Sequence, residues 1–336
     1  MAMFLLNNTF IMGLHCLVGA NYLNLMTNYG LRKIVFSVIT AIVSFFFSLP
    51  RTLRGLSTLG AIAALTTFIS VILATIFSAI EPHPEGYPDQ GEPIFRLIPE
   101  KGTSFVTAMN AFLNISYTFI GQITLPSFIA EMENPKDFPK SLWAVTICEV
   151  LLFGVVGSVI YAYTGTQYMT SPAFGSIANM VYRKIAFSFM IPTLIFLGVL
   201  YASVSARFLF FRIFGSNSRH KTSHTVLGWA TWAGILAVLW GLAFLVAEVI
   251  PVFNDLLSIM SSFFDSFFGF IFWGVAYIRL KRESDGPGFY RKNGVKGWLG
   301  LFLHLGIIGI GLFFLGPGTY ASISSIIDNY RDGTAS

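Results

Sequence analysis

The polar residues that could do chemistry gather in one otherwise apolar stretch, between Val106 and Leu142. Where the middle of a membrane span would fall, this stretch carries Asn114, Ser116, Tyr117, Thr118, Gly121, Gln122 and Thr124. Pro126 follows and lacks the backbone donor that a continuous helix needs, while Gly121 tolerates backbone angles that other residues avoid. The stretch therefore predicts a helix that is broken near Gly121.

A broken helix at this depth offers binding chemistry. Irregular backbone within a membrane survives only where it lines a cavity or is buried in protein, because lipid cannot satisfy its polar groups. Free N–H groups at a helix break can hold a carboxylate, and free carbonyl groups can hold an ammonium group. An amino acid carries both of these charges. The candidate binding residues lie around the predicted break and are Asn114, Ser116, Phe119, Gly121 and Gln122. The alternative is that Pro126 only bends the helix for packing.

Ionisable side chains inside apolar segments are the next candidates, since an isolated charge in mid-bilayer costs about 3 kcal/mol or more. Glu149 lies in WAVTICEVLLFG and Asp265 lies in SSFFDSFFG. Glu149 is our first candidate for taking up and releasing a proton, and Glu131, which follows the broken helix, is the second. For Glu248 and Asp255, solvation near the expected outer interface is the simpler interpretation.

Other polar residues within apolar segments are weaker candidates. Ser203 and Ser205 could line a cavity, although Ser and Thr often bridge packed helices instead. His15 could relay a proton, although a hydrogen-bonded histidine between packed helices is the simpler interpretation. Cys16 and Cys148 show neither a disulfide pattern nor a metal-ligand spacing. The sequence has no nucleophile elbow and no phosphate-binding loop, so we expect neither an enzyme nor a bound cofactor.

The composition indicates what surrounds these residues. Of 336 residues, 54% are hydrophobic and 11% are charged, and the mean hydropathy is +0.70. Soluble domains contain about 25% charged residues, so most of this surface meets lipid rather than water. The net charge of +5 is spread over short loops and forms no basic stripe, so we expect no nucleic-acid partner.

A helix needs about 20 apolar residues to cross the bilayer core, and the sequence has nine candidate stretches. We predict an all-α polytopic membrane protein, because the alternating strands of about ten residues that form a β-barrel are absent. The predicted spans are Met3–Met26, Ile34–Leu49, Leu59–Ile80, Phe105–Ala130, Leu142–Tyr163, Ile185–Phe211, Val226–Ala247, Phe253–Ile278 and Trp298–Leu315.

The basic residues predict how these spans are oriented, because cytoplasmic loops carry the excess of Lys and Arg. With Met1 on the cytoplasmic side, fourteen of the 21 Lys and Arg residues lie inside and seven lie outside. The acidic, Pro-rich loop Glu81–Gly102 is then outside, and the basic loop Arg279–Gly297 is inside.

Several segments resemble the amino acid/auxin permease family, and they follow one another in the family's order. GQITLPSFIAEMENPKDFPKSL is similar to its broken sixth helix with the following loop, and SFFFSLPRTLRGLSTLG to the connection between its fourth and fifth helices. The start of the family's eighth helix is similar to VYRKIAFSFMIPTLIFLGV. The family's tenth helix is similar to LAFLVAEVIPVFNDLLSIMSSFFDSFFGF, and its third helix is similar to IMGLHCLVGANYLNLMTNYG. Fungal neutral amino-acid permeases are the most similar group.

The resemblance implies a five-plus-five inverted-repeat transporter fold. It implies proton-coupled symport of neutral amino acids by alternating access in the plasma or vacuolar membrane, with a proton or sodium gradient as energy source. We expect one transporter domain over residues 1–336, with a remnant of the first repeat in 1–80, the second repeat in 103–278 and an extra helix in 298–315. The lipid bilayer and a neutral amino acid are the expected partners. The family's first two helices have no counterpart, so the alternative is a non-transporting truncated pseudo-transporter or membrane subunit.

Overall fold

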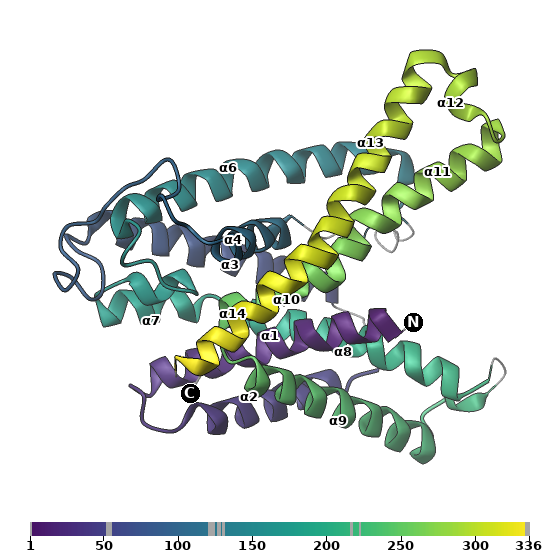
Figure 1. The fold of residues 1–336 in the computed structure, drawn as a ribbon. Coiled ribbons are helices and arrows are strands. Elements are labelled where there is room, and N and C mark those ends of the chain that lie inside the picture. The colour runs from purple at the N-terminus through teal and green to yellow at the C-terminus, as the bar shows by residue number, and fades with distance from the viewer. Residues whose placement is uncertain are drawn as a thin grey trace. The chain divides into compact units, whose positions relative to one another are not determined.

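The computed structural model describes residues 2–51, 56–119, 125, 129, 132–215, 218–221 and 223–332. Within these ranges the chain consists of helices and their connections, and contains no strand (Figure 1). The chain divides into two compact units. Unit 1 comprises Met1–Pro99 and Glu149–Phe253, and unit 2 comprises Glu100–Cys148 and Asn254–Ser336.

Unit 1 is a helical bundle around its first helix. Helix α1 packs against α2, α8 and α9, and α3 packs against α7 and α8 (Figure 1). The elements are α1 (Ala2–Met26), α2 (Lys33–Ser48), α3 (Leu56–Ile80), the second half of α6 (Phe138–Thr164), η3 (Ala173–Ser176), α7 (Met180–Ser188), α8 (Ile191–Ile213), η4 (Arg219–Lys221) and α9 (Val226–Val249).

Small residues and polar bridges hold α1 against its neighbours. A Cβ atom added at Gly13 would lie 2.8 Å from Cγ1 of Val246, so α1 and α9 cross with almost no space between them. Nδ2 of Asn8 donates a hydrogen bond of 2.9 Å to Oγ of Ser205, which joins α1 to α8. Close approach and interhelical hydrogen bonds of this kind drive helix association in lipid, where hydrophobic burial contributes little.

The two loops of unit 1 that we predict to lie outside are joined by hydrogen bonds. The Glu81 carboxylate accepts from the Tyr163 hydroxyl at 2.6 Å and from the backbone N–H groups of Ala178 and Asn179 at 3.0 Å. Tyr168 adds a further link, because its hydroxyl donates to the carbonyl of Gly91 at 2.7 Å. The connection after α3 and the connection after α6 therefore form one ordered layer.

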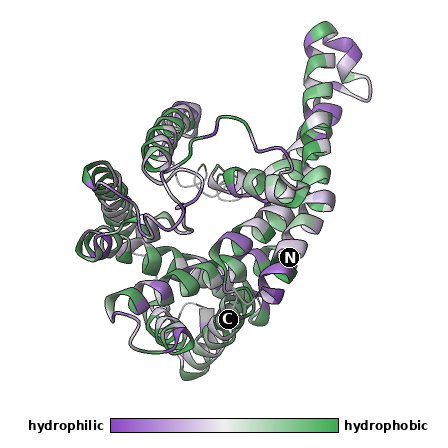
Figure 2. Cartoon of the chain, turned by 60° about the vertical axis from the view of Figure 1, so that its left-hand side comes forward, coloured by the Kyte–Doolittle hydropathy of each residue, from purple (hydrophilic) through white to green (hydrophobic). Residues whose placement is uncertain are grey.

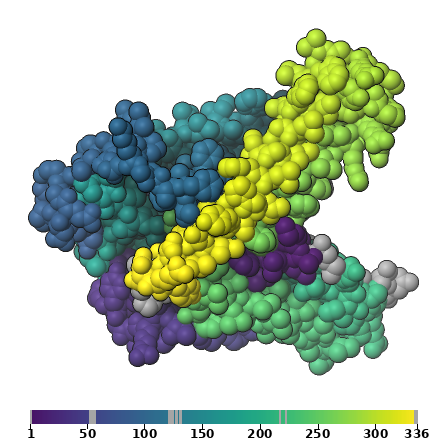
Figure 3. All heavy atoms as spheres, in the orientation of Figure 1, coloured from purple at the N-terminus to yellow at the C-terminus, as the bar shows by residue number. Residues whose placement is uncertain are grey.

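Unit 2 contains a helical hairpin, one arm of which continues into a long helical rod. Helices α11 and α13 are joined at α12, where hydrophilic residues gather (Figure 2), and α13 continues as a rod through α14 (Figure 3). The elements are α4 (Phe105–Thr118), η2 (Pro135–Asp137), the first half of α6, α10 (Phe253–Met260), η5 (Ser261–Ile271), α11 (Phe272–Asp285), α12 (Phe289–Lys292), α13 (Gly294–Phe313), η6 (Phe314–Gly318) and α14 (Thr319–Arg331). Both η5 and η6 are π-helical.

The core of unit 2 forms where α4 meets the π-helical turn η6. Met109 and Leu113 of α4 are buried against Phe314 and Ala321. A Cβ atom added at Gly318 would lie 3.2 Å from Cε of Met109, so this glycine permits the close approach.

The described helices agree with the predicted spans in most places. Within the described ranges, seven helical segments are long and apolar enough to cross a membrane, and all seven overlap predicted spans. Of the other two predicted spans, Ile34–Leu49 coincides closely with the shorter helix α2, and Phe105–Ala130 begins with α4, which ends at Thr118. Large apolar side chains are exposed along these helices, for example Phe46 at 61% and Trp143 at 70%. Such a surface suits lipid, and the predicted class of polytopic α-helical membrane protein is confirmed.

Two predicted boundaries were wrong. The predicted span Ile185–Phe211 is two helices, α7 and α8, and Pro192 lies in the first turn of α8, where its missing N–H group costs nothing. The predicted end at Leu315 is also wrong, because the helix continues to Arg331. Pro317 does not end this helix, because it lies within η6, where a π-helical turn interrupts the regular hydrogen-bond ladder that a proline would disrupt.

Candidate functional site

Helix α4 ends inside the predicted span that carries the candidate binding residues. Its start is capped by Ser104, whose hydroxyl accepts from the N–H of Thr107 at 3.1 Å, and its last residue is Thr118. Its 14 residues extend about 21 Å, which is less than the bilayer core of about 30 Å. The helix thus stops just before the predicted break. Gly121, Gln122 and Glu131 lie outside the described residues.

Asn114 lies in a cluster of neutral polar side chains. Its Oδ1 accepts a hydrogen bond of 3.0 Å from Oγ of Ser258, and its Nδ2 donates to Oδ1 of Asn254. Ser258 also contacts the carbonyl of Asn254 at 3.1 Å, so three residues from α4 and α10 orient one another. Ser116 and Phe119 lie further along α4, where Ser116 is half-buried and Phe119 is 40% exposed. We call Asn114, Asn254 and Ser258 the amide cluster.

Our reading of the sequence missed Asn254 and Ser258. Both belong to the segment LAFLVAEVIPVFNDLLSIM, which drew attention only through its resemblance to a family helix. The signal that was available is their spacing of four residues, which places two polar side chains on one face of a helix.

Asp255 is buried, so the interpretation that it is solvated was wrong. Its side chain is 3% exposed and accepts hydrogen bonds from Oγ of Ser325 at 2.8 Å and Nδ2 of Asn329 at 2.6 Å. Both donors belong to α14, which we did not predict because we ended the last span at Leu315.

Asp265 lies in the π-helical segment η5 and is 7% exposed. Three serines of the same segment, Ser261, Ser262 and Ser266, are also buried. Oδ2 of Asp265 has no hydrogen-bond partner among the residues that the structure describes. π-Helical turns often occur at functional sites, and a buried carboxylate with an unpartnered oxygen is a candidate for proton exchange.

Glu149 has a different environment. It is partly exposed on α6, a helix on which only Ile160, Tyr163 and Thr164 are buried. No hydrogen bond or ion pair of Glu149 occurs within the described part of the chain. The structure therefore places this candidate on a sparsely packed helix, apart from any polar cluster within its own unit.

The serines that we considered as cavity-lining residues are both in the packed interior of unit 1. Ser203 is 4% exposed and Ser205 is fully buried. Because Ser205 accepts the hydrogen bond from Asn8, its geometry supports the alternative role of bridging two helices. His15 also lies in this unit, and its Nδ1 is buried without a hydrogen-bond partner in the described ranges.

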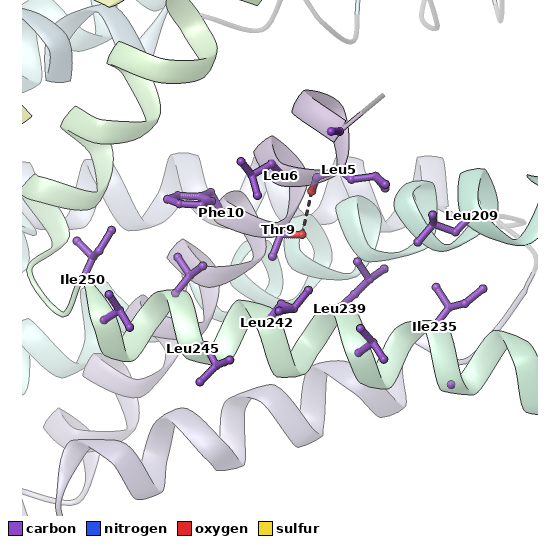
Figure 4. A pocket seen from close by; sticks show the side chains of 15 residues that line it. Leu5, Leu6, Thr9, Phe10, Leu209, Ile235, Leu239, Leu242, Leu245 and Ile250 are labelled. Carbon is purple, nitrogen blue, oxygen red and sulfur yellow. Dashed lines mark hydrogen bonds between the residues drawn. The ribbon is translucent and has the colours of Figure 1, made fainter. Parts of the chain in front are cut away.

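One groove of unit 1 is apolar (Figure 4). It has a volume of about 730 Å³ and is lined by the first turns of α1, by α9 and by Leu209 of α8. Its one hydroxyl, that of Thr9, donates to the carbonyl of Leu5 at 2.8 Å, as the dashed line in Figure 4 marks. A zwitterion would find no polar partner there, and burying a charge without one is costly. This groove suits a lipid chain better than an amino acid.

Several known membrane transporters are similar in sequence to this chain. The family described as "Transmembrane amino acid transporter protein" matches residues 1–324. The N amino acid transport system protein of Neurospora crassa is 31% identical over 99% of this chain and 69% of its own length. Transmembrane transporters of Fusarium pseudograminearum and Gibberella moniliformis are each 28% identical over 93% of this chain, and over 63% and 64% of their own lengths. No solved structure matches.

This chain thus spans about two thirds of the length of the curated relatives. The match to the family covers all the described helices except the last residues of α14. The predicted family is therefore confirmed: the chain is an integral membrane protein that belongs to the transmembrane amino acid transporter family.

Proposed function

We propose that this protein transports neutral amino acids across the plasma or vacuolar membrane by proton-coupled symport. The observation that carries the proposal is the amide cluster beside the end of α4. Amide and hydroxyl groups can hold both charges of a zwitterion, whereas a cationic or anionic side chain would need an opposite charge. The nearest carboxylate in sequence, Asp255, is already bonded to Ser325 and Asn329, so it does not supply one.

The relatives support the substrate class. The Neurospora crassa relative is named for amino acid transport, and the matching family is one of amino acid transporters. In the proposed mechanism, alternating access proceeds around the break that follows α4, with Ser116, Phe119, Gly121 and Gln122 completing the site that begins at Asn114. Half-helix ends of this kind bind substrate in other transporters that have broken helices.

Glu149 and Glu131 remain our candidates for the proton-coupling residue. The burial of Asp265 adds a third candidate, because Oδ2 of its carboxylate has no hydrogen-bond partner among the described residues. A proton that binds with the substrate and leaves with it would supply the driving force from a proton gradient.

Uptake into proteoliposomes tests the proposal. In a form of this protein that also carries the family's first two helices, taken from a relative, we expect saturable uptake of radiolabelled leucine that rises when the outside is acidic, is abolished by a protonophore, and is competed by phenylalanine but not by lysine or glutamate. Asn114→Leu should remove uptake. Asn110→Leu is the matched control, because Asn110 lies one turn earlier on α4 and makes only a long hydrogen bond of 3.5 Å. If the correctly inserted chain shows no uptake under any gradient, the alternative of a non-transporting membrane subunit is favoured instead.

A further inference from the structure

A small polar pocket lies in unit 1, at the end of α1 that we predict to face outward. Its volume is about 190 Å³. Asn21 and Asn24 of α1 line it together with Arg183 of α7, and Leu25 and Phe187 form part of its wall. We call it the outer pocket. It shares no residue with the amide cluster.

Arg183 supplies a buried cation to the outer pocket. The residue is only 5% exposed, so its guanidinium group needs partners within the protein. Nε and Nη2 donate to the carbonyl of Ile177, and Nη2 lies 2.9 Å from Oε2 of Glu85. Nη1 has no hydrogen-bond partner in the part of the chain that the structure describes. Arg183 is thus fixed and electrically balanced by Glu85, and it keeps one donor unused.

Asn24 supplies a hydrogen-bond acceptor. Its Oδ1 is buried and has no hydrogen-bond partner among the described residues. An acceptor in this state costs free energy unless a donor fills the space in front of it. Asn24 and Arg183 both line the outer pocket, and each has one polar atom without a hydrogen-bond partner among the described residues.

We propose that the outer pocket binds a small neutral amino acid as a zwitterion. The carboxylate of the ligand accepts from Nη1 of Arg183, and its ammonium group donates to Oδ1 of Asn24. The pocket has no net charge, because Glu85 balances Arg183, so an overall neutral ligand matches it better than an anion or a cation. Leu25, Phe174 and Phe187 offer an apolar wall to a short side chain.

The size of the outer pocket fits this ligand. A volume of about 190 Å³ equals that of roughly six water molecules. Alanine has about as many non-hydrogen atoms, so it would fill the space. The ligand class agrees with the proposed function, but the argument for the outer pocket depends only on the residues that line it.

Protection from cysteine labelling tests the proposal with the 336-residue chain in lipid nanodiscs. Cys148 is exposed and is first replaced by serine, whereas Cys16 is buried and stays. Asn21→Cys then places a thiol in the pocket for reaction with a maleimide. We expect L-alanine to slow the reaction, and propionate or ethylamine at the same concentration to leave its rate unchanged. Equal protection by propionate would make this an anion site and overturn the proposal.

Further variants assign the effect to Asn24. Asn24→Leu should raise the alanine concentration for half-protection by about tenfold or more, the loss expected when a hydrogen bond to a charged group is removed. Gln90→Leu is the control, because Gln90 is an exposed amide on the same predicted side of the membrane. If Asn24→Leu does not fold, the nearly isosteric Asn24→Asp should gain protection by ethylamine, and unchanged selectivity in that variant would contradict the proposal.

One comparison separates this inference from the proposed function. Protection by alanine in Asn114→Leu, which lacks the amide cluster, would show that the outer pocket binds independently even if uptake fails. Protection that is lost in Asn114→Leu and retained in Asn24→Leu would place the ligand at the amide cluster and refute the outer pocket.

Discussion

Gly13 offers a direct test of how tightly α1 packs in unit 1. In Gly13→Ala the added methyl group would lie 2.8 Å from Cγ1 of Val246 and 3.1 Å from the carbonyl oxygen of Ala243. The first contact is shorter than carbon atoms tolerate, and the second involves backbone that cannot rotate away. Helices α1 and α9 must therefore separate, or Val246 must leave its preferred rotamer.

The expected magnitude follows from comparison with a second glycine. Overpacking by one methyl group costs about 1–3 kcal/mol, while replacing a helical glycine by alanine gains about 1 kcal/mol. Gly234 of α9 has no atom within 4 Å of an added Cβ, so Gly234→Ala shows the gain alone. Both variants gain the same helix propensity, so this gain cancels when they are compared. The difference between their free energies of unfolding is then the packing cost of about 1–3 kcal/mol.

Thermal unfolding of the purified chain in nanodiscs, followed by circular dichroism, measures this difference. At about 2–4 °C for each kcal/mol in chains of 150–250 residues, Gly13→Ala should melt several degrees below Gly234→Ala. Equal melting temperatures would refute the close crossing of α1 and α9 at Gly13.

Three other predictions concern topology and transport. Gln90→Cys should react with an impermeant maleimide in intact cells and Gly286→Cys should not, and the reverse pattern would invert the predicted orientation. Gly121→Val should abolish leucine uptake while the protein still reaches the membrane, because a branched side chain would block the approach of substrate to the backbone; normal uptake would remove the break from the mechanism. If Glu149 carries the proton, Glu149→Gln should flatten the pH dependence of uptake, and Glu131→Gln should do so if Glu131 is the carrier. An unchanged pH profile in both variants would exclude both residues.

Much of the fold could be predicted because the bilayer constrains a chain so strongly. The apolar stretches from Met3 to Met26 and from Val226 to Ala247 could only be helices that cross lipid, since no other single segment satisfies its own backbone there. Their helices, α1 and α9, end within a few residues of the predicted bounds. The same reasoning identified the class of protein, and the motifs after Gly121 identified its family.

Boundaries at prolines were less predictable. A proline removes one backbone donor wherever it lies, but the result depends on the turn that surrounds it. Pro192 begins α8, whereas Pro317 is accommodated within a π-helical turn and the helix continues. The contacts around Gly318, with Met109 and Leu113 of α4, belong to the packing of unit 2 and leave no mark in the local sequence.

The sequence by itself determined which segments enter the membrane and which polar residues go with them, because length and apolarity are local properties. Only the tertiary structure decided what those polar residues contact. Asn114 meets Asn254 and Ser258, and Asp255 meets donors some 70 residues away on α14. A buried polar group is stable only if its partner arrives from elsewhere in the chain. The partner is a property of helix packing, and the residue alone does not specify it.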